Sequence, residues 1–174
     1  MSIIKRLILL CLLLLVVGCQ PEKKVESIPI QVKVVRVVSG QTLEVLGMGE
    51  QPNLISQVRL IGLEAPDFRQ RPWGLDAKEN LEALIARAPV SLEFDIQAKD
   101  KIGRTLAYVW KDKILLNEQM IKDGYALYAP RFPNHKYDLR LERSQQWSRL
   151  MGLGIWNPDK PLRTSPSEFR RATR

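Results

Sequence analysis

The chain contains very little cysteine and histidine, and this scarcity excludes several kinds of chemistry. Of its 174 residues only Cys11 and Cys19 are cysteines, and both lie within the first nineteen positions. A domain built from the rest of the chain therefore has no disulfide, no thiolate metal site and no cysteine nucleophile. His135 is the single histidine, which argues against zinc chemistry and against a Ser-His-Asp triad.

The chain also lacks an apolar run long enough to cross a bilayer. The run Leu7–Val17 follows Lys5 and Arg6 and is closed by Gly-Cys at Cys19. It is shorter than the roughly 20 residues that span a membrane and fits a signal peptide. We therefore expect a lipoprotein signal peptide over 1–18, a lipidated Cys19, and an exported protein that is membrane-anchored in the periplasm or at the cell surface. An uncleaved anchor with Cys19 as a passive apolar residue is the alternative.

Acidic residues are fewer than basic ones. Lys and Arg total 27 against 19 Asp and Glu, which gives a formal net charge of +8 and a sequence pI near 9.7. A basic surface favours polyanions or anionic lipid headgroups as partners. The composition suits one compact domain with appendages. We expect a polar tether over 19–29, one domain over 30–157, and a mobile, proline-containing basic tail over 158–174.

Alternating and periodic apolar residues predict the elements of that domain. We expect five strands, at Ile30–Val38, Thr42–Leu46, Ser56–Leu63, Val90–Ile96 and Thr105–Trp110. Three helical segments are expected, around Ala77–Ala88, from an N-cap at Asn117 to Gly124, and from Asn134 to Gly152 or Gly154. The order β-β-β-α-β-β-α-α predicts an α+β fold, an OB-type five-stranded antiparallel barrel with about three α-helices against it.

Two arginines and two carboxylates draw attention as candidates for phosphate chemistry. Arg59 lies on an expected strand, Glu64 and Asp67 follow at its end, and Arg104 opens another strand after a glycine. A guanidinium matches the oxygens of a phosphate, and a carboxylate can orient or deprotonate the attacking water. Each residue also has a simpler interpretation as a surface ion pair, Arg59 with either carboxylate and Arg104 with Asp100.

Taken in order, these stretches resemble the thermonuclease, or staphylococcal-nuclease-like (SNase), family in its bacterial lipoprotein form. The resemblance runs from about Val32 to Trp156. It rests on the first hairpin, the Arg strand before an x-Ala-Pro-acid turn, the segment Asp-Lys-x-Gly-Arg-x-Leu-Ala-Tyr, Asn-Glu at a helix start, and a closing Gly-Ile-Trp.

The resemblance implies a catalytic set and a cofactor. Arg59 and Arg104 align with the two catalytic arginines, and Asp67 with the general base or water-orienting carboxylate. Calcium ligands are implied at three positions: Glu64, Gln41 and the backbone carbonyl of Ala65. The implied activity is Ca²⁺-dependent endonucleolytic cleavage of DNA or RNA, by a monomer tethered to the membrane through the lipid on Cys19.

Departures from the family pattern keep other readings open. Gln41 stands where the family has a calcium-binding aspartate, and because an amide carbonyl adds no charge, metal affinity should fall. Ile102 replaces an aromatic that stacks on the nucleotide, which leaves Tyr128 and Lys101 as candidate substrate-binding residues. The alternative functions are a weakened or inactive OB-type module that binds nucleic acid or protein, and a structural envelope lipoprotein.

Overall fold

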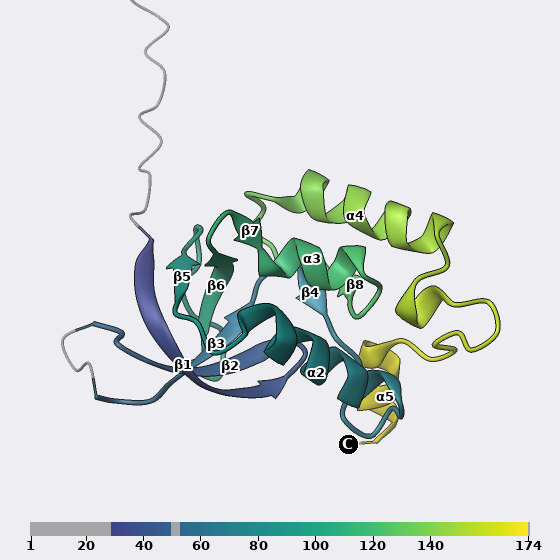
Figure 1. Cartoon of the computed structure of the whole chain (residues 1–174), viewed down its shortest axis with the longest axis horizontal. Coiled ribbons are helices and arrows are strands. Elements are labelled where there is room, and N and C mark those ends of the chain that lie inside the picture. Colours follow the sequence, from purple (N-terminus) through teal and green to yellow (C-terminus); the bar gives the residue numbers. More distant parts are fainter. Residues whose placement is uncertain (1–28, 50–52, 174) are drawn as a thin grey trace, which may run out of the picture.

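Five strands close into a small barrel in the computed structural model, which describes residues 29–49 and 53–173 (Figure 1). They are β1 (Ile30–Ser39), β2 (Thr42–Leu46), β3 (Ser56–Leu60), β5 (Val90–Glu93) and β6 (Thr105–Lys111). Their order is β3-β2-β1-β5-β6, and β3 also pairs with β6 to close the barrel. The expected OB-type α+β fold is confirmed. The β3–β6 pair is parallel, because an odd number of strands cannot alternate in direction all the way round a closed ring.

The barrel interior is filled by branched apolar side chains. Alternate residues of a strand face opposite sides of a sheet, so a strand with one solvated face shows alternating burial. In β6 the first five residues are all buried, because the barrel interior covers one face and α3 (Leu116–Lys122) packs on the other. The largest fully buried side chains include Leu43, Leu60, Leu92, Leu106 and Tyr108.

Helices cover the barrel, and three of them were predicted from the sequence. α2 (Trp73–Ile85) buries Ala77, Leu81 and Ile85, the stripe that the sequence pattern indicated. It lies so close to the β1–β2 turn that a Cβ at Gly40 would come within 2.7 Å of the Ala77 Cβ. α3 and α4 (Asp138–Leu150) pack against each other. The short elements β4 (Leu63–Glu64), β7 (Ile114–Leu115), β8 (Leu127–Tyr128) and η1 (Gly154–Trp156) complete this part.

Asn117 has a different role from the N-cap that the sequence suggested. The N-cap of α3 is Leu115, and Asn117 is fully buried. Its Oδ1 accepts a hydrogen bond of 2.8 Å from the Val109 N–H, and its Nδ2 donates to the carbonyl oxygens of Ile61 at 2.8 Å and Ala107 at 3.3 Å. The N-cap prediction was therefore wrong, because the side chain satisfies buried backbone groups of the barrel instead.

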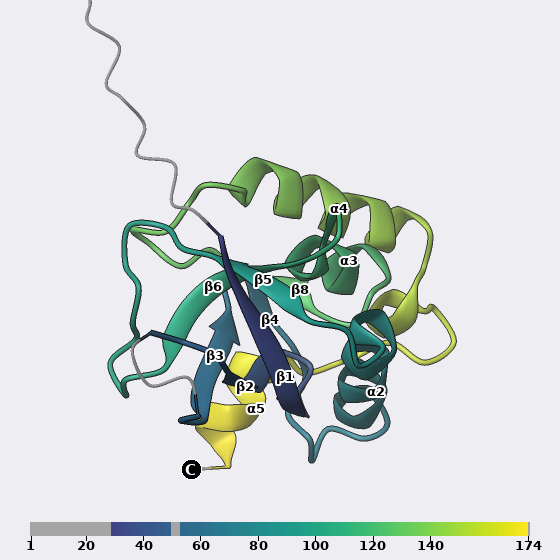
Figure 2. The same cartoon turned by 60° about the vertical axis from the view of Figure 1, so that its left-hand side comes forward.

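The C-terminal residues differ from the mobile tail expected over 158–174. Residues Pro166–Ala172 form a helix, α5, whose first turn is closed by a capping box between Ser165 and Glu168. The sequence Ser-Pro-Ser-Glu carries both the capping box and a proline at the first helical position, two signals for a helix start. Figures 1 and 2 show α4 and α5 on opposite sides of the barrel.

The predicted signal peptide (1–18), the lipidated Cys19 and most of the tether lie outside the described residues. Within 29–49 and 53–173, no helix combines the length and apolar character needed to cross a membrane.

Candidate active site

Strand pairing gathers the chemically interesting stretches of the sequence around Arg59. In β3, Arg59 lies opposite Thr42 of β2 and Leu106 of β6. Gln41 directly precedes the first of these neighbours, and Arg104 lies two residues before the second. The β1–β2 turn, the end of β3 and the start of β6 therefore meet at one end of the barrel, as the sequence predicted.

Arg59 is a buried cation with few partners. Its residue is 5% exposed, its Nη2 donates one hydrogen bond of 3.3 Å to the Leu63 carbonyl oxygen, and its Nε is buried with no partner. Among the described residues it forms no ion pair. Burial, together with the positive charges of Arg131, Arg104 and Arg170, lowers the pKa of Arg59 to about 10, and the negative charge of Glu64 only partly opposes this shift. A buried guanidinium that has an unpartnered N–H and no ion pair is suited to bind an anion.

Four guanidiniums meet at this end of the barrel. We refer to them as the arginine cluster: Arg59, Arg104, Arg131 and Arg170. Arg131 lies near Arg59 because the chain before it is tied to the end of β3: the Ala129 N–H donates to the Gly62 carbonyl oxygen at 3.0 Å. The sequence analysis missed Arg131, which no local pattern marks. It also missed Arg170, although the Ser-Pro-Ser-Glu signal indicates the helix that carries it.

Arg104 is oriented by its own loop. Its Nε and Nη2 each lie 2.8 Å from Oδ2 of Asp100. Oδ1 of Asp100 accepts the backbone N–H groups of Ile102 and Arg104 at 3.1 and 3.0 Å. Burial disfavours the ionised form of Asp100, but these hydrogen bonds outweigh burial and lower its pKa. The simple ion pair considered from the sequence is thus present, and it fixes Arg104 beside Lys101 and Ile102, which are exposed.

The two candidate carboxylates are both held by arginines. Glu64, at the end of β4, forms an ion pair with Arg170 of α5. Oδ1 of Asp67 lies 2.9 Å from Nε of Arg69 and accepts the Arg69 N–H at 3.1 Å. The side-chain hydrogen bond from Arg69 holds the pKa of Asp67 below its ordinary value, with a further contribution from the charge of Arg170.

Close backbone packing positions the segment that carries Asp67. Gly74 lies in the first turn of α2, where a Cβ would come within 2.1 Å of the Asp67 carbonyl oxygen. Oε1 of Gln70 accepts the Asp67 N–H at 2.9 Å. Oε1 of Gln41 accepts the Ala65 N–H at 2.8 Å. Gln41 therefore ties the β1–β2 turn to the chain that follows β4.

The calcium ligands implied by the resemblance do not fit a calcium ion in this arrangement. Calcium takes six to eight oxygen ligands, carboxylates prominent among them. The described residues include no group of three or more His, Cys, Asp or Glu side chains placed to hold a metal. Glu64 already binds a guanidinium, and the amide oxygen of Gln41 already accepts the N–H of Ala65.

Tyr128, a candidate substrate-binding residue, is half-buried where β8 meets α4. Its backbone N–H donates to Oε1 of Gln145 at 2.9 Å. Burial and the neighbouring Asp138 carboxylate raise the pKa of Tyr128 to about 12. The role of Tyr128 in substrate binding stays a prediction.

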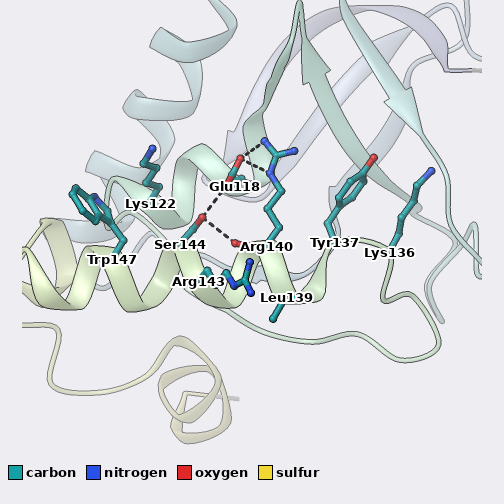
Figure 3. Close-up of a pocket in the computed structure, with 9 residues that line it drawn as sticks. All are labelled: Glu118, Lys122, Lys136, Tyr137, Leu139, Arg140, Arg143, Ser144 and Trp147. Atoms are coloured by element: carbon teal, nitrogen blue, oxygen red, sulfur yellow. Dashed lines mark hydrogen bonds and ion pairs between the residues drawn. The ribbon is translucent and has the colours of Figure 1, made fainter.

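A hollow lies between α3 and α4. This groove, of about 530 Å³, is lined by Glu118, Lys122, Lys136, Tyr137, Leu139, Arg140, Arg143, Ser144 and Trp147 (Figure 3). We refer to it as the α3–α4 groove. Several of its charges are paired, since Glu118 binds Arg140 and accepts a hydrogen bond from Ser144, and Lys136 binds Glu93. None of the arginine cluster lines it.

Comparisons with known proteins agree with this geometry. The family model described as "Staphylococcal nuclease homologue" matches residues 57–158. The chain is 37% identical over 130 residues to a thermonuclease of Staphylococcus hyicus, and the aligned region covers 72% of this chain and 75% of that protein. A thermonuclease of Staphylococcus intermedius is 34% identical over 126 residues, with 70% and 73% covered. An uncharacterized endonuclease of Haemophilus influenzae is 31% identical over 172 residues, with 97% and 87% covered. The chain therefore belongs to the family of staphylococcal nuclease homologues, which places it among the nucleases.

Proposed function

We propose that this chain hydrolyses phosphodiester bonds of DNA or RNA and that the arginine cluster binds the scissile phosphate. One observation carries the proposal: Arg59 is buried without an ion pair, has an unpartnered Nε, and has positive neighbours. Burying a charge without an ion pair is unfavourable even with the carboxylate of Glu64 nearby, and a bound phosphodiester would relieve this by accepting hydrogen bonds and supplying negative charge. The names of the endonuclease and thermonuclease relatives support the same substrate class.

The roles of the side chains follow from their surroundings. Arg59 and Arg104 bind the non-bridging oxygens of the phosphate and stabilise the negative charge that grows on the pentacoordinate phosphorus. Asp67 orients the attacking water. Because hydrogen bonding lowers the pKa of Asp67, its carboxylate is a weak base, which favours the orienting role over full proton abstraction.

The decisive experiment measures cleavage of single-stranded DNA and of RNA by the purified protein, with and without calcium. Replacing Arg59 or Arg104 by Ala should lower the initial rate by about 10²- to 10³-fold for each lost charge-stabilising group. Arg36→Ala is the matched control, because Arg36 is a surface arginine on β1 that pairs with Glu44. Equal rates in wild type and in both cluster variants would refute the proposal.

Calcium dependence stays part of the proposal and rests on the resemblance. Glu64, Gln41 and the Ala65 carbonyl offer only oxygen donors, the type that a hard divalent cation takes. Their present hydrogen bonds and ion pair must rearrange before they can act as ligands. A calcium titration of the cleavage rate tests this point, and full activity in excess chelator would refute it.

A second candidate function is binding of nucleic acid without cleavage. One observation favours it: the described residues include no group of three or more His, Cys, Asp or Glu side chains placed to hold a metal ion. Under this alternative the protein would retain DNA with a steep salt dependence and leave it intact in calcium. An electrophoretic binding assay, followed by analysis of the recovered DNA, separates the two functions.

The membrane anchor is proposed from the sequence alone. Its support is the charged start, the short apolar run and the Gly-Cys that closes it. Metabolic labelling with a radioactive fatty acid should mark the wild-type protein and leave Cys19→Ser unlabelled. Equal labelling of both would contradict lipidation at Cys19.

A further inference from the structure

The solvent-facing side of α4 is apolar and basic. At about 100° per residue, five residues of the helix and its C-cap fall within about a third of a turn: Leu139, Arg143, Trp147, Leu150 and Met151. All five are exposed, Leu150 to 83% and Leu139 to 61%. We refer to them as the α4 outer face. It contains no acidic residue, because Glu142, an exposed acid of the helix, lies outside this arc.

This face stays uncovered within the described part of the chain. The opposite side of the helix buries Leu141, Ser144 and Ser148 against the domain. Arg143 forms no ion pair with a described residue, and neither does Lys122, which lies with Trp147 at one end of the α3–α4 groove (Figure 3). A contiguous exposed apolar patch rimmed by polar side chains marks an interaction surface.

The chain before β1 enters the domain next to the start of α4. Ile30, the first residue of β1, pairs with Leu92 of β5. The next residue, Glu93, forms an ion pair with Lys136 and accepts a hydrogen bond of 3.0 Å from the hydroxyl of Tyr137, the N-cap of α4. Figures 1 and 2 show the start of β1 on the α4 side of the barrel, away from α5.

A lipid on Cys19 would therefore hold the α4 outer face near a membrane. The stretch from Cys19 to Ile30 spans at most about 40 Å when fully extended. Tethering within such a reach raises the local concentration of the face at the bilayer. A lipid anchor combined with a basic surface also holds a protein on a membrane more firmly than either signal alone.

We propose that the α4 outer face docks the protein onto an anionic lipid surface. The side chains of Leu139, Trp147 and Leu150 enter the interfacial region, while Arg143 and Lys122 bind the headgroup phosphates. Tryptophan is enriched at the membrane–water interface, and a helix with one apolar and basic side lies in the plane of the interface without spanning the bilayer. This inference goes beyond the proposed hydrolysis and does not depend on it.

The composition of the face favours a lipid surface over other occupants. Single-stranded nucleic acid binds to successive aromatic side chains, whereas this face offers one aromatic beside three aliphatic chains. A second copy of the face would bring Arg143 against like charge, which opposes pairing. Anionic headgroups above acyl chains match both the basic and the aliphatic part of the face.

Docking through α4 leaves the arginine cluster open to its substrate. Helix α5, which supplies Arg170 to the cluster, lies on the opposite side of the barrel from α4 (Figures 1 and 2). A polyanion can therefore reach the cluster while the α4 outer face rests on lipid. The two basic regions of the molecule then serve different partners.

The test measures quenching of tryptophan fluorescence by vesicles with brominated acyl chains, with no nucleic acid present. The full chain carries Cys19→Ser in every variant, so that no attached lipid contributes. The signal of Trp147 is the difference between this protein and the same protein with Trp147→Phe. Vesicles that contain phosphatidylglycerol should quench it at least about 5-fold more than vesicles of phosphatidylcholine alone at equal lipid concentration, because anionic headgroups attract the basic side chains.

Matched substitutions separate this face from the rest of the surface. Arg143→Glu should raise the lipid concentration for half-maximal quenching by at least about 5-fold, the usual effect of one basic side chain at an anionic surface. Arg171→Glu changes the net charge equally on the exposed side of α5 and should leave that concentration within about 2-fold, because salt screens distant charges. Leu150→Ala should raise it by about 5- to 10-fold through lost apolar burial, whereas Ile102→Ala, at a similarly exposed residue beside the cluster, should not.

Several outcomes would overturn the docking surface. The first two are absent quenching of Trp147 by anionic vesicles and equal losses in Arg143→Glu and Arg171→Glu. A dimer in sedimentation velocity that Leu150→Ala dissociates would assign the face to a second copy of the chain. An oligonucleotide that shields Trp147 from an aqueous quencher, when vesicles do not, would assign it to nucleic acid. Quenching by anionic vesicles in a protein that cleaves no nucleic acid would sustain the docking surface and refute only the proposed nuclease function.

Discussion

The arginine cluster and the α3–α4 groove both contain basic side chains that form ion pairs, but only the cluster contains a buried cation that forms none among the described residues. In the groove, Arg140 binds Glu118 and Lys136 binds Glu93, so much of the charge is neutralised within the fold. In the cluster, Arg59 is more deeply buried than any of these residues and has positive neighbours and no ion pair. Paired charge needs no ligand, whereas unpaired buried charge is tolerated where a ligand completes it. This contrast supports the proposal that the cluster binds the phosphate.

The largest predicted effect comes from removing the buried charge of the cluster. Arg59→Met keeps most of the side-chain volume and should lower the rate of nucleic-acid hydrolysis by about 10²- to 10³-fold. The melting temperature should stay the same or rise, because a repelled and partly unsatisfied cation is lost. Initial rates and thermal denaturation measure the two effects.

The groove offers the opposite control. Arg140→Met removes the cation that pairs with Glu118 and should lower the melting temperature by about 2–4 °C, while the rate of hydrolysis stays near that of the wild type. A loss of rate in Arg140→Met comparable to that in Arg59→Met would erase the distinction between the two regions.

The next effect concerns the water-orienting carboxylate. Asp67→Asn keeps the size of the side chain and removes its charge, so the rate should fall by about 10²-fold. Affinity for an uncleaved oligonucleotide should not fall, because the arginines that bind phosphate are intact. Weaker binding with an unchanged maximal rate would assign Asp67 to substrate binding instead.

A smaller effect is expected in the pH dependence of the rate. The pKa of Asp67 is lowered in the fold from its ordinary value of 3.8, so its ionised form and the stability linked to it are fully present above pH 3.8. Both are lost as the pH falls through the lower, folded-state pKa. Arg69→Ala removes the main cause of the lowering and should move the acid limb of the rate profile to higher pH. An acid limb that stays in place would exclude Asp67 as the titrating group.

The smallest effects are predicted at the exposed rim of the groove. Trp147 is 47% exposed, and Arg143 forms no ion pair among the described residues. Replacing either by Ala should change the rate of hydrolysis and the binding of nucleic acid by no more than about 2-fold, as expected of surface substitutions away from a site. A larger loss of binding would show that the groove also holds the nucleic acid.

Local sequence patterns predicted the barrel because its strands are short apolar runs bounded by turn signals and its helices carry periodic apolar stripes, such as Ala77, Leu81 and Ile85 in α2. The convergence on Arg59 was predictable too, since the β1–β2 hairpin brings Thr42 and Gln41 near it once β2 pairs with β3. The other charged residues that surround Arg59 could not be predicted from the sequence. Arg131 and Arg170 arrive through contacts between distant segments, such as Ala129 with Gly62 and Arg170 with Glu64, and no local periodicity encodes such contacts.

The most direct test of the central claim is the affinity of a fluorescent single-stranded oligonucleotide in excess chelator, compared between wild type, Arg59→Met and Arg140→Met. We expect Arg59→Met to bind at least about 10-fold more weakly, as expected for losing a charge-assisted contact in a buried site, and Arg140→Met to bind like the wild type. Equal binding by wild type and Arg59→Met would contradict the claim that the arginine cluster holds the phosphate.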